Sequence, residues 1–138
     1  MFRITRFVIS VAIAAFLVAA CAQAAPSTNS KTVVVTPAIK GNSASLNVGD
    51  KLEIQLPTIP SEGYSWVPQD LDTSILVQEG EAVYTADSNP NSAGGVVTLR
   101  FNAVGKGTTA LTLAYENSPA DGSPGFSTDS FSLAVEVK

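Results

Sequence analysis

The side chains that most often perform enzyme chemistry are scarce in this sequence. It contains no His and a single Cys, Cys21, which excludes Ser-His and Cys-His nucleophile pairs and zinc-thiolate sites. Two carboxylate pairs, Asp70 with Asp72 and Glu79 with Glu81, have the residue types for acid-base chemistry. Charged residues in turns are normally solvated, however. The composition therefore favours a binding role and not an enzyme.

Residues 87–92, Asp-Ser-Asn-Pro-Asn-Ser, are weakly similar to a calcium-binding loop. They lack the sixth-position Gly and the closing Glu of such loops. We therefore predict neither a metal nor a cofactor. A catalytic interpretation requires Asp70, Asp72 or Asp87 to be buried beside a pocket.

The N-terminal residues 1–20 have the organisation of a secretory signal peptide. Arg3 and Arg6 precede an apolar run, residues 7–20, that is shorter than a transmembrane helix requires. The alternative is a retained membrane anchor. Residues 21–30, rich in Ala, Pro, Ser and Asn, are expected to form a flexible tether.

Two processing sites overlap at the end of this signal. Residues 18–21, Val-Ala-Ala-Cys, resemble a bacterial lipobox, whose cleavage would leave Cys21 at the N-terminus for lipidation. Residues 22–24, Ala-Gln-Ala, match an ordinary signal-peptidase site, whose cleavage would remove Cys21. We favour the lipoprotein. Both outcomes predict an extracytoplasmic protein, either a periplasmic or outer-envelope lipoprotein or a secreted one.

The folded part of the chain carries a negative net charge. Twelve acidic residues face eight basic ones, and two of the basic residues lie in 1–20, so the remainder has a net charge of −6. Nucleic-acid-binding proteins show basic patches instead. We expect no nucleic-acid partner, and contact with a membrane only through a lipid on Cys21.

From Lys31 onward, apolar and polar residues alternate with the period of two that is typical of half-buried strands. The clearest alternation places Leu52, Ile54 and Leu56 on one face, and Pro57 is expected to end that strand. Residues 68–74 could form a short helical turn. Further strands are expected in the ranges 32–36, 43–48, 63–67, 74–77, 82–85, 97–103, 109–115 and 131–137.

Short strands at this spacing, separated by Gly- and Pro-rich turns, predict an all-β domain over residues 31–138. The expected fold is an immunoglobulin-like antiparallel β-sandwich of seven or eight strands. Since no Cys pair can join the sheets, aromatic residues are expected to fill the core: Trp66, Phe101, Tyr115 and Phe131.

One turn combines features that suit a binding loop. Pro60 fixes its own φ, and Gly63 permits a backbone turn that a Cβ would oppose. Tyr64 and Trp66 follow in the next strand. An ordinary β-turn before a core Trp would show the same pattern. In a Greek-key sandwich, however, alternate loops cluster at one end, and the loops around residues 60–64, 92–95 and 116–125 are candidates for that cluster.

These loops resemble those of the chagasin family, inhibitors of papain-like cysteine peptidases. The family's first loop reads Asn-Pro-Thr-Thr-Gly-Tyr/Phe with a Trp two residues on. Here Pro60, Gly63, Tyr64 and Trp66 match, Ser61 keeps a hydroxyl, and Ile59 and Glu62 differ.

The family's second loop, Gly-rich before a long strand, is similar to Gly94-Gly95. Its third motif is Arg-Pro-Trp. Asn117, Ser118, Pro119 and Ala120 stand at that place and keep only the Pro.

The resemblance implies a non-enzymatic, reversible inhibitor that blocks the peptidase cleft with three loops. The first loop would enter as extended backbone, and the two glycines would let backbone approach the peptidase. We expect a monomer. The alternative, favoured by the missing Arg-Pro-Trp, is a non-catalytic envelope adhesion or structural domain that has lost peptidase binding. The implied peptidase-binding residues are Pro60, Ser61, Glu62, Gly63, Tyr64, Gly94, Gly95, Asn117, Ser118 and Pro119.

Overall fold

The computed structural model describes residues 29–39, 43–89, 91–117 and 125–138. Within these residues there are nine strands and two short 3-10 helices. None of the described helices is long and apolar enough to cross a membrane. In chain order the elements are β1 (Thr32–Val35), η1 (Pro37–Ile39), β2 (Ser43–Leu46), β3 (Lys51–Thr58), η2 (Pro60–Glu62), β4 (Tyr64–Asp70), β5 (Leu76–Gln78), β6 (Val83–Ala86), β7 (Gly95–Ala103), β8 (Gly107–Asn117) and β9 (Ser127–Val137).

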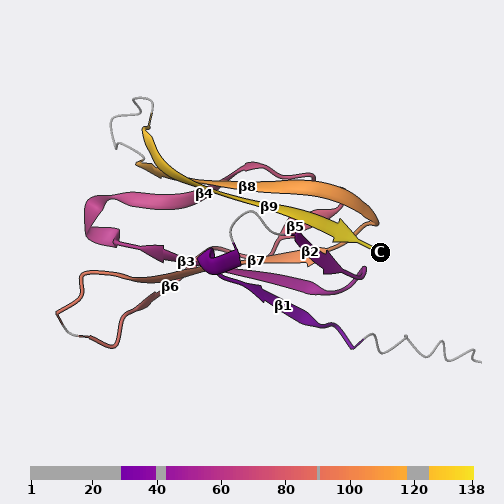
Figure 1. Cartoon of the computed structure of the whole chain (residues 1–138), viewed down its shortest axis with the longest axis horizontal. Coiled ribbons are helices and arrows are strands. Elements are labelled where there is room, and N and C mark those ends of the chain that lie inside the picture. The colour runs from indigo at the N-terminus through magenta and orange to yellow at the C-terminus, as the bar shows by residue number, and fades with distance from the viewer. Residues whose placement is uncertain (1–28, 40–42, 90, 118–124) are drawn as a thin grey trace, which may run out of the picture.

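The strands form two sheets packed face to face, as Figure 1 shows. One sheet has the order β1-β3-β7, and β5 and β6 both pair with the free edge of β7. The other has the order β2-β9-β8-β4. The predicted all-β sandwich is confirmed. Nine strands are described, against the expected seven or eight. The two short strands expected at 74–77 and 82–85 form as β5 and β6, with Gly80 in a left-handed conformation (φ 69°) between them.

Two edge pairings are parallel and not antiparallel as expected. β1 runs parallel to β3, and β2 runs parallel to β9. The chain leaves β1 in the first sheet, passes η1 and joins the second sheet in the reverse direction. The remaining pairings are antiparallel.

The core lies between the sheets and is formed by alternate residues of the central strands. In β3 the side chains of Leu52, Ile54 and Leu56 are buried, as the alternation predicts. Phe101, Phe131 and Trp66 are buried as well, while Tyr115 is half-buried against the core. Burial of each large apolar side chain contributes about 2 kcal/mol.

Prolines do not interrupt the strands where the sequence suggested. Pro57 lies within β3, opposite Val96. The register with β1 extends only to Ile54, so near Pro57 a missing N–H is tolerated as on an edge strand. Pro68 lies within edge strand β4 beside a register shift. The helical turn expected at residues 68–74 is instead found at Asp72–Ile75, where the N–H of Ile75 donates to the carbonyl of Asp72 at 3.0 Å.

Candidate functional site

Strand register brings three connections to the same end of the sandwich. Thr58, the last residue of β3, pairs with Gly95, the first residue of β7, and Gly95 also pairs with Ala86 at the end of β6. In the other sheet Tyr64 pairs with Asn117, the last residue of β8. We call this region the loop end. It comprises residues 59–63, 87–94 and the facing ends of β8 and β9, and lies at the left of Figure 1.

The first loop is a tight 3-10 turn closed by a glycine. The N–H of Glu62 donates to the carbonyl of Ile59 at 3.0 Å, and that of Gly63 to the carbonyl of Pro60 at 3.1 Å. Gly63 is left-handed, with φ 74° and ψ 19°. Ser61, Glu62 and Gly63 are exposed at the tip, and Tyr64 is half-buried. The expectation of an extended backbone in this loop is wrong, because the Pro60–Gly63 pair closes a helical turn.

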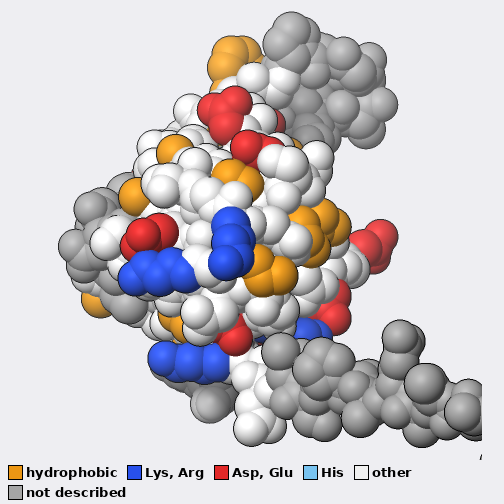
Figure 2. Space-filling model, turned by 90° about the vertical axis from the view of Figure 1, so that its right-hand side faces the viewer, with side chains coloured by type: hydrophobic (Ala, Val, Ile, Leu, Met, Phe, Trp, Pro, Cys, Tyr) orange, Lys and Arg blue, Asp and Glu red, His pale blue; other side chains and the backbone are white. Residues whose placement is uncertain are grey.

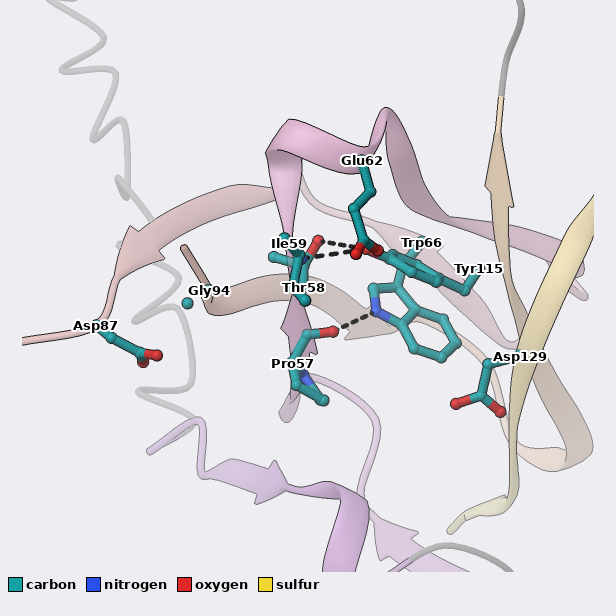
Figure 3. Close-up of a pocket in the computed structure, with 10 residues that line it drawn as sticks. Pro57, Thr58, Ile59, Glu62, Trp66, Asp87, Gly94, Tyr115 and Asp129 are labelled. Carbon is teal, nitrogen blue, oxygen red and sulfur yellow. Dashed lines mark hydrogen bonds between the residues drawn. The ribbon is translucent and has the colours of Figure 1, made fainter. Parts of the chain in front are cut away.

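Three aromatic side chains fix the first loop from below. Tyr115 packs against Tyr64 with ring centroids 5.3 Å apart, and against Trp66 at 5.0 Å. The indole N–H of Trp66 donates to the carbonyl of Pro57 at 2.9 Å. The hydroxyl of Tyr115 accepts from the N–H of Ile59 at 3.1 Å (Figure 3). These bonds join β4 and β8 in one sheet to the end of β3 in the other, so the turn is held before any partner binds.

The two glycines of the second loop differ in their surroundings. Gly94 is half-buried, and a Cβ there would meet its nearest atoms at 3.5 Å, an ordinary contact. Gly95 is buried, and a Cβ there would lie 2.3 Å from the carbonyl oxygen of Thr85 and 2.6 Å from the ring of Tyr84. The Tyr84 ring therefore occupies the space on the Cβ side of Gly95, and the predicted contact of Gly95 with a peptidase stays a prediction.

The third connection is described only at its ends. Asn117 is half-buried, and its N–H donates to the carbonyl of Phe126 at 3.1 Å. Ser118 and Pro119 lie outside the described residues, as do Cys21 and residues 1–20. Their predicted roles stay predictions.

A cleft of about 290 Å³ opens beneath the first loop, between the ends of the two sheets. Three acidic residues line it, namely Glu62 on η2, Asp87 after β6 and Asp129 on β9. All three are exposed, and the described residues contain no group of three or more His, Cys, Asp or Glu arranged to hold a metal ion. Figure 3 shows Asp87 and Asp129 on opposite sides of Trp66.

The other carboxylates lie away from this cleft. Asp72 accepts bonds from the hydroxyl and the N–H of Ser74, which hold the pKa of the Asp72 carboxyl below its ordinary value. Glu79 forms an ion pair with Lys51 at 2.8 Å. Asp70 is the last residue of β4, and Asp72 lies just beyond it, at the end opposite the loop end. None of these groups forms a buried acid pair beside the cleft, the arrangement that catalysis would require.

The described cations are distributed unevenly. Arg100 lies midway along β7, and the other described cations, Lys31, Lys51, Lys106 and Lys138, lie at the end opposite the loop end. Figure 2 views that opposite end, where Lys and Arg side chains lie among Asp and Glu. In the described part of the chain, the loop end therefore carries acidic residues and no basic ones.

Comparison with known proteins agrees with this arrangement. The family model described as Chagasin family peptidase inhibitor I42 matches residues 45–135. The chain belongs to the chagasin family. No curated protein matches it by sequence.

Solved structures with the same fold include a cysteine protease inhibitor. The inhibitor EhICP2 from Entamoeba histolytica is 19% identical over 80% of this chain and 98% of its own, with a TM-score of 0.68. The solution structure of Amebosin is 23% identical over 78% of this chain and 98% of its own, with a TM-score of 0.58. At these identities the likeness concerns the fold.

Membership of the chagasin family confirms the predicted function class. The protein is an inhibitor of papain-like cysteine peptidases and not an enzyme. The sequence pattern did not indicate a role for Tyr84 or Asp129, which line the two hollows at the loop end. A signal for Tyr84 existed, since an aromatic residue on a short strand often covers a glycine on its neighbour.

Proposed function

We propose that this chagasin-family inhibitor acts by seating its loop end in the active-site cleft of a papain-like peptidase. The observation that supports this best is the convergence of three chain-distant connections around a prefolded first loop. Ser61 and Glu62 are exposed at the tip of that loop, and Glu62 also lines the cleft beneath it. In this arrangement they would lie nearest the peptidase nucleophile.

The rigidity of the first loop explains how such an inhibitor would bind without being cleaved. Three hydrogen bonds and two ring contacts hold residues 57–64 in place, so little conformational entropy is lost on binding. A 3-10 turn cannot present an extended peptide bond to the nucleophile. Residues on the second loop, including Gly94, and on the third loop, including Asn117, would contact the two walls of the cleft.

The direct test is inhibition of papain by residues 25–138. We expect competitive inhibition, with the inhibitor intact by mass spectrometry after prolonged incubation. A dissociation constant of ~10 μM is already weaker than that of a typical specific complex. Absence of inhibition at this concentration would therefore contradict the proposal. Recovery of an envelope protein and no peptidase, by pull-down from a periplasmic extract, would instead support the alternative of an adhesion or structural domain.

Ser61→Arg is the sharpest variant for this test. Ser61 is exposed, so the substitution should leave the thermal unfolding transition unchanged while a long cationic side chain blocks entry of the tip. Gly63→Pro is less specific, because φ 74° and the N–H bond of Gly63 are both incompatible with proline. Glu136→Arg, a similar change on the exposed face of β9 at the opposite end, is the control.

We also propose that the protein is exported and anchored through a lipid on Cys21. The support is the sequence of residues 1–24 described above. The intact mass of the mature protein distinguishes the two processing sites. A diacylglyceryl adduct on an N-terminal Cys is expected, whereas a chain beginning at Ala25 without Cys21 would overturn lipidation.

A further inference from the structure

A second recess adjoins the loop end, between the edge strands of the two sheets. It has a volume of about 220 Å³ and opens between β4 and β6. This volume is below the range of about 300–1,000 Å³ that is typical of small-molecule sites. The lining contains no charged side chain, in contrast to the acidic cleft; it comprises Thr58, Pro60, Tyr64, Ser65, Trp66, Ala82, Tyr84 and Val97.

Tyr84 forms one wall of this recess and is held in a fixed position. It pairs with buried Val97, so its ring lies on the inner face of the sheet, diagonal to Gly95. A Cβ on Gly95 would lie 2.6 Å from the ring, which shows how closely the ring covers that glycine. The Tyr84 hydroxyl donates to the carbonyl of Gly94 at 3.1 Å.

In spite of these contacts Tyr84 remains 44% exposed. An aromatic side chain that is already ordered loses little rotamer entropy when a partner covers it. Tyrosines of this kind are frequent among the residues that dominate interface energies. Gly95 therefore makes room for the Tyr84 ring, and Gly94 accepts the bond from its hydroxyl.

The recess is continuous with the surface that would enter the peptidase. Pro60 and Tyr64, which flank the tip of the first loop, also line the recess. A peptidase seated on the first loop must therefore cover the recess on one side.

We propose that Tyr84 is a specificity-determining contact and that the recess between β4 and β6 receives an apolar side chain from the wall of the peptidase cleft. This inference rests on the proposed function. The recess would favour peptidases with an apolar residue on that wall. It would disfavour peptidases with a charged residue there, because no side chain of opposite charge lines the recess. An aromatic contact here also supplies an anchor in a chain that lacks the Trp of the Arg-Pro-Trp motif.

The test compares papain inhibition by wild type and four variants. Tyr84→Ala should raise the inhibition constant about tenfold or more, chiefly through faster dissociation. Tyr84→Phe, which keeps the ring, should stay within about threefold. Ala82→Phe, which fills the recess from its rim, should also weaken inhibition. Val104→Ala, which removes exposed apolar surface at the opposite end, should have no effect.

The outcomes separate this inference from the proposed function. If wild type inhibits papain and Tyr84→Ala or Ala82→Phe has the same inhibition constant, the recess contact is wrong. The proposed function as an inhibitor is then unaffected. No inhibition by wild type overturns both. Dimeric wild type beside monomeric Tyr84→Ala in sedimentation would assign the recess to a second copy. If Tyr84→Ala does not fold, hydrogen exchange of wild type is measured with and without papain. Papain should increase the protection of amides in β6, and no increase would contradict the contact.

Discussion

Glu62 is the residue of the first loop that departs furthest in chemistry from the family pattern. Its carboxylate is exposed at the tip and, among the described residues, accepts no hydrogen bond and joins no ion pair. A carboxylate at this place is desolvated when the tip enters a cleft, and such burial is costly unless a cation faces it.

Glu62→Thr restores the family residue and should tighten inhibition of a peptidase that has no Lys or Arg beside its nucleophile. We expect about a tenfold lower inhibition constant, equivalent to about 1.4 kcal/mol. Glu136→Thr, on the exposed face of β9, serves as the matched control. Weaker inhibition by Glu62→Thr would show that the carboxylate contributes a favourable contact.

Tyr115 connects the two sheets through a single hydroxyl. It lies 3.3 Å from the Thr58 hydroxyl and accepts from Ile59. Tyr115→Phe keeps the ring contacts with Tyr64 and Trp66 but loses both bonds. The free energy of unfolding should fall by about 1 kcal/mol in urea titration, and papain inhibition should weaken several-fold because the first loop is less ordered. Unchanged stability and inhibition would mean that ring packing alone holds the loop.

At the scale of elements, η2 depends on one backbone conformation. Gly63 has φ 74°, and open space surrounds the position of a Cβ. Gly63→Ala should therefore cost about 1–2 kcal/mol of folding free energy through backbone strain alone. Gly94→Ala, where φ is not left-handed and contacts are ordinary, should change stability by less than about 0.5 kcal/mol. Equal thermal shifts for the two variants would contradict this account.

The start of β1 is joined to the turn before β3 through Asp50. The carboxylate accepts from the N–H of Asn47 at 2.8 Å and from that of Lys31 at 2.9 Å. These two bonds, Asn47 first, lower the pKa of Asp50 in spite of its burial. A lowered folded pKa contributes stability above the unfolded value and loses it as the pH falls through the folded value.

Asp50→Asn should accordingly destabilise the protein at pH 7 and have a smaller effect below pH about 4, where wild type has lost the same contribution. Urea midpoints measured at pH 7 and pH 3 test this, with Asp70→Asn as a control of equal charge change. An identical difference at both pH values would refute the linkage.

The elements were largely predictable from sequence, and the contacts between them were not. Alternation in residues 51–56 and 131–137 identified the buried faces, because one residue in two must face the core. Whether Pro57 ended its strand depended on how far β1 extends beside it, which the local sequence does not encode. The contact of Tyr84 with Gly95 depends on the pairing of β6 with β7. The local sequence does not encode that pairing either, so Tyr84 was missed.

At the scale of the whole molecule, charge is distributed along the long axis. The loop end carries Glu62, Asp87, Glu116 and Asp129, while the described Lys residues lie at the other end. Association with a peptidase whose cleft rim is basic should slow as salt rises, and association with an acidic one should accelerate. Stopped-flow rates between 20 mM and 500 mM NaCl, chosen so that screening spans about 20 to 4 Å, would check this. Glu62→Gln with Asp87→Asn should flatten the dependence, and Asp70→Asn should not.

The parallel pairing of β1 with β3 determines where the chain enters the domain. Since β3 runs toward the loop end, Lys31 and Thr32 lie at the opposite end. A bilayer, bead or sensor chip attached ahead of Lys31 would therefore be joined to the opposite end of the domain and leave Ser61 at the end farthest from the attachment point. Attachment through the N-terminus leaves the inhibitory surface open to capture a passing peptidase, whereas immobilisation through a residue near Asn117 would bury it against the support.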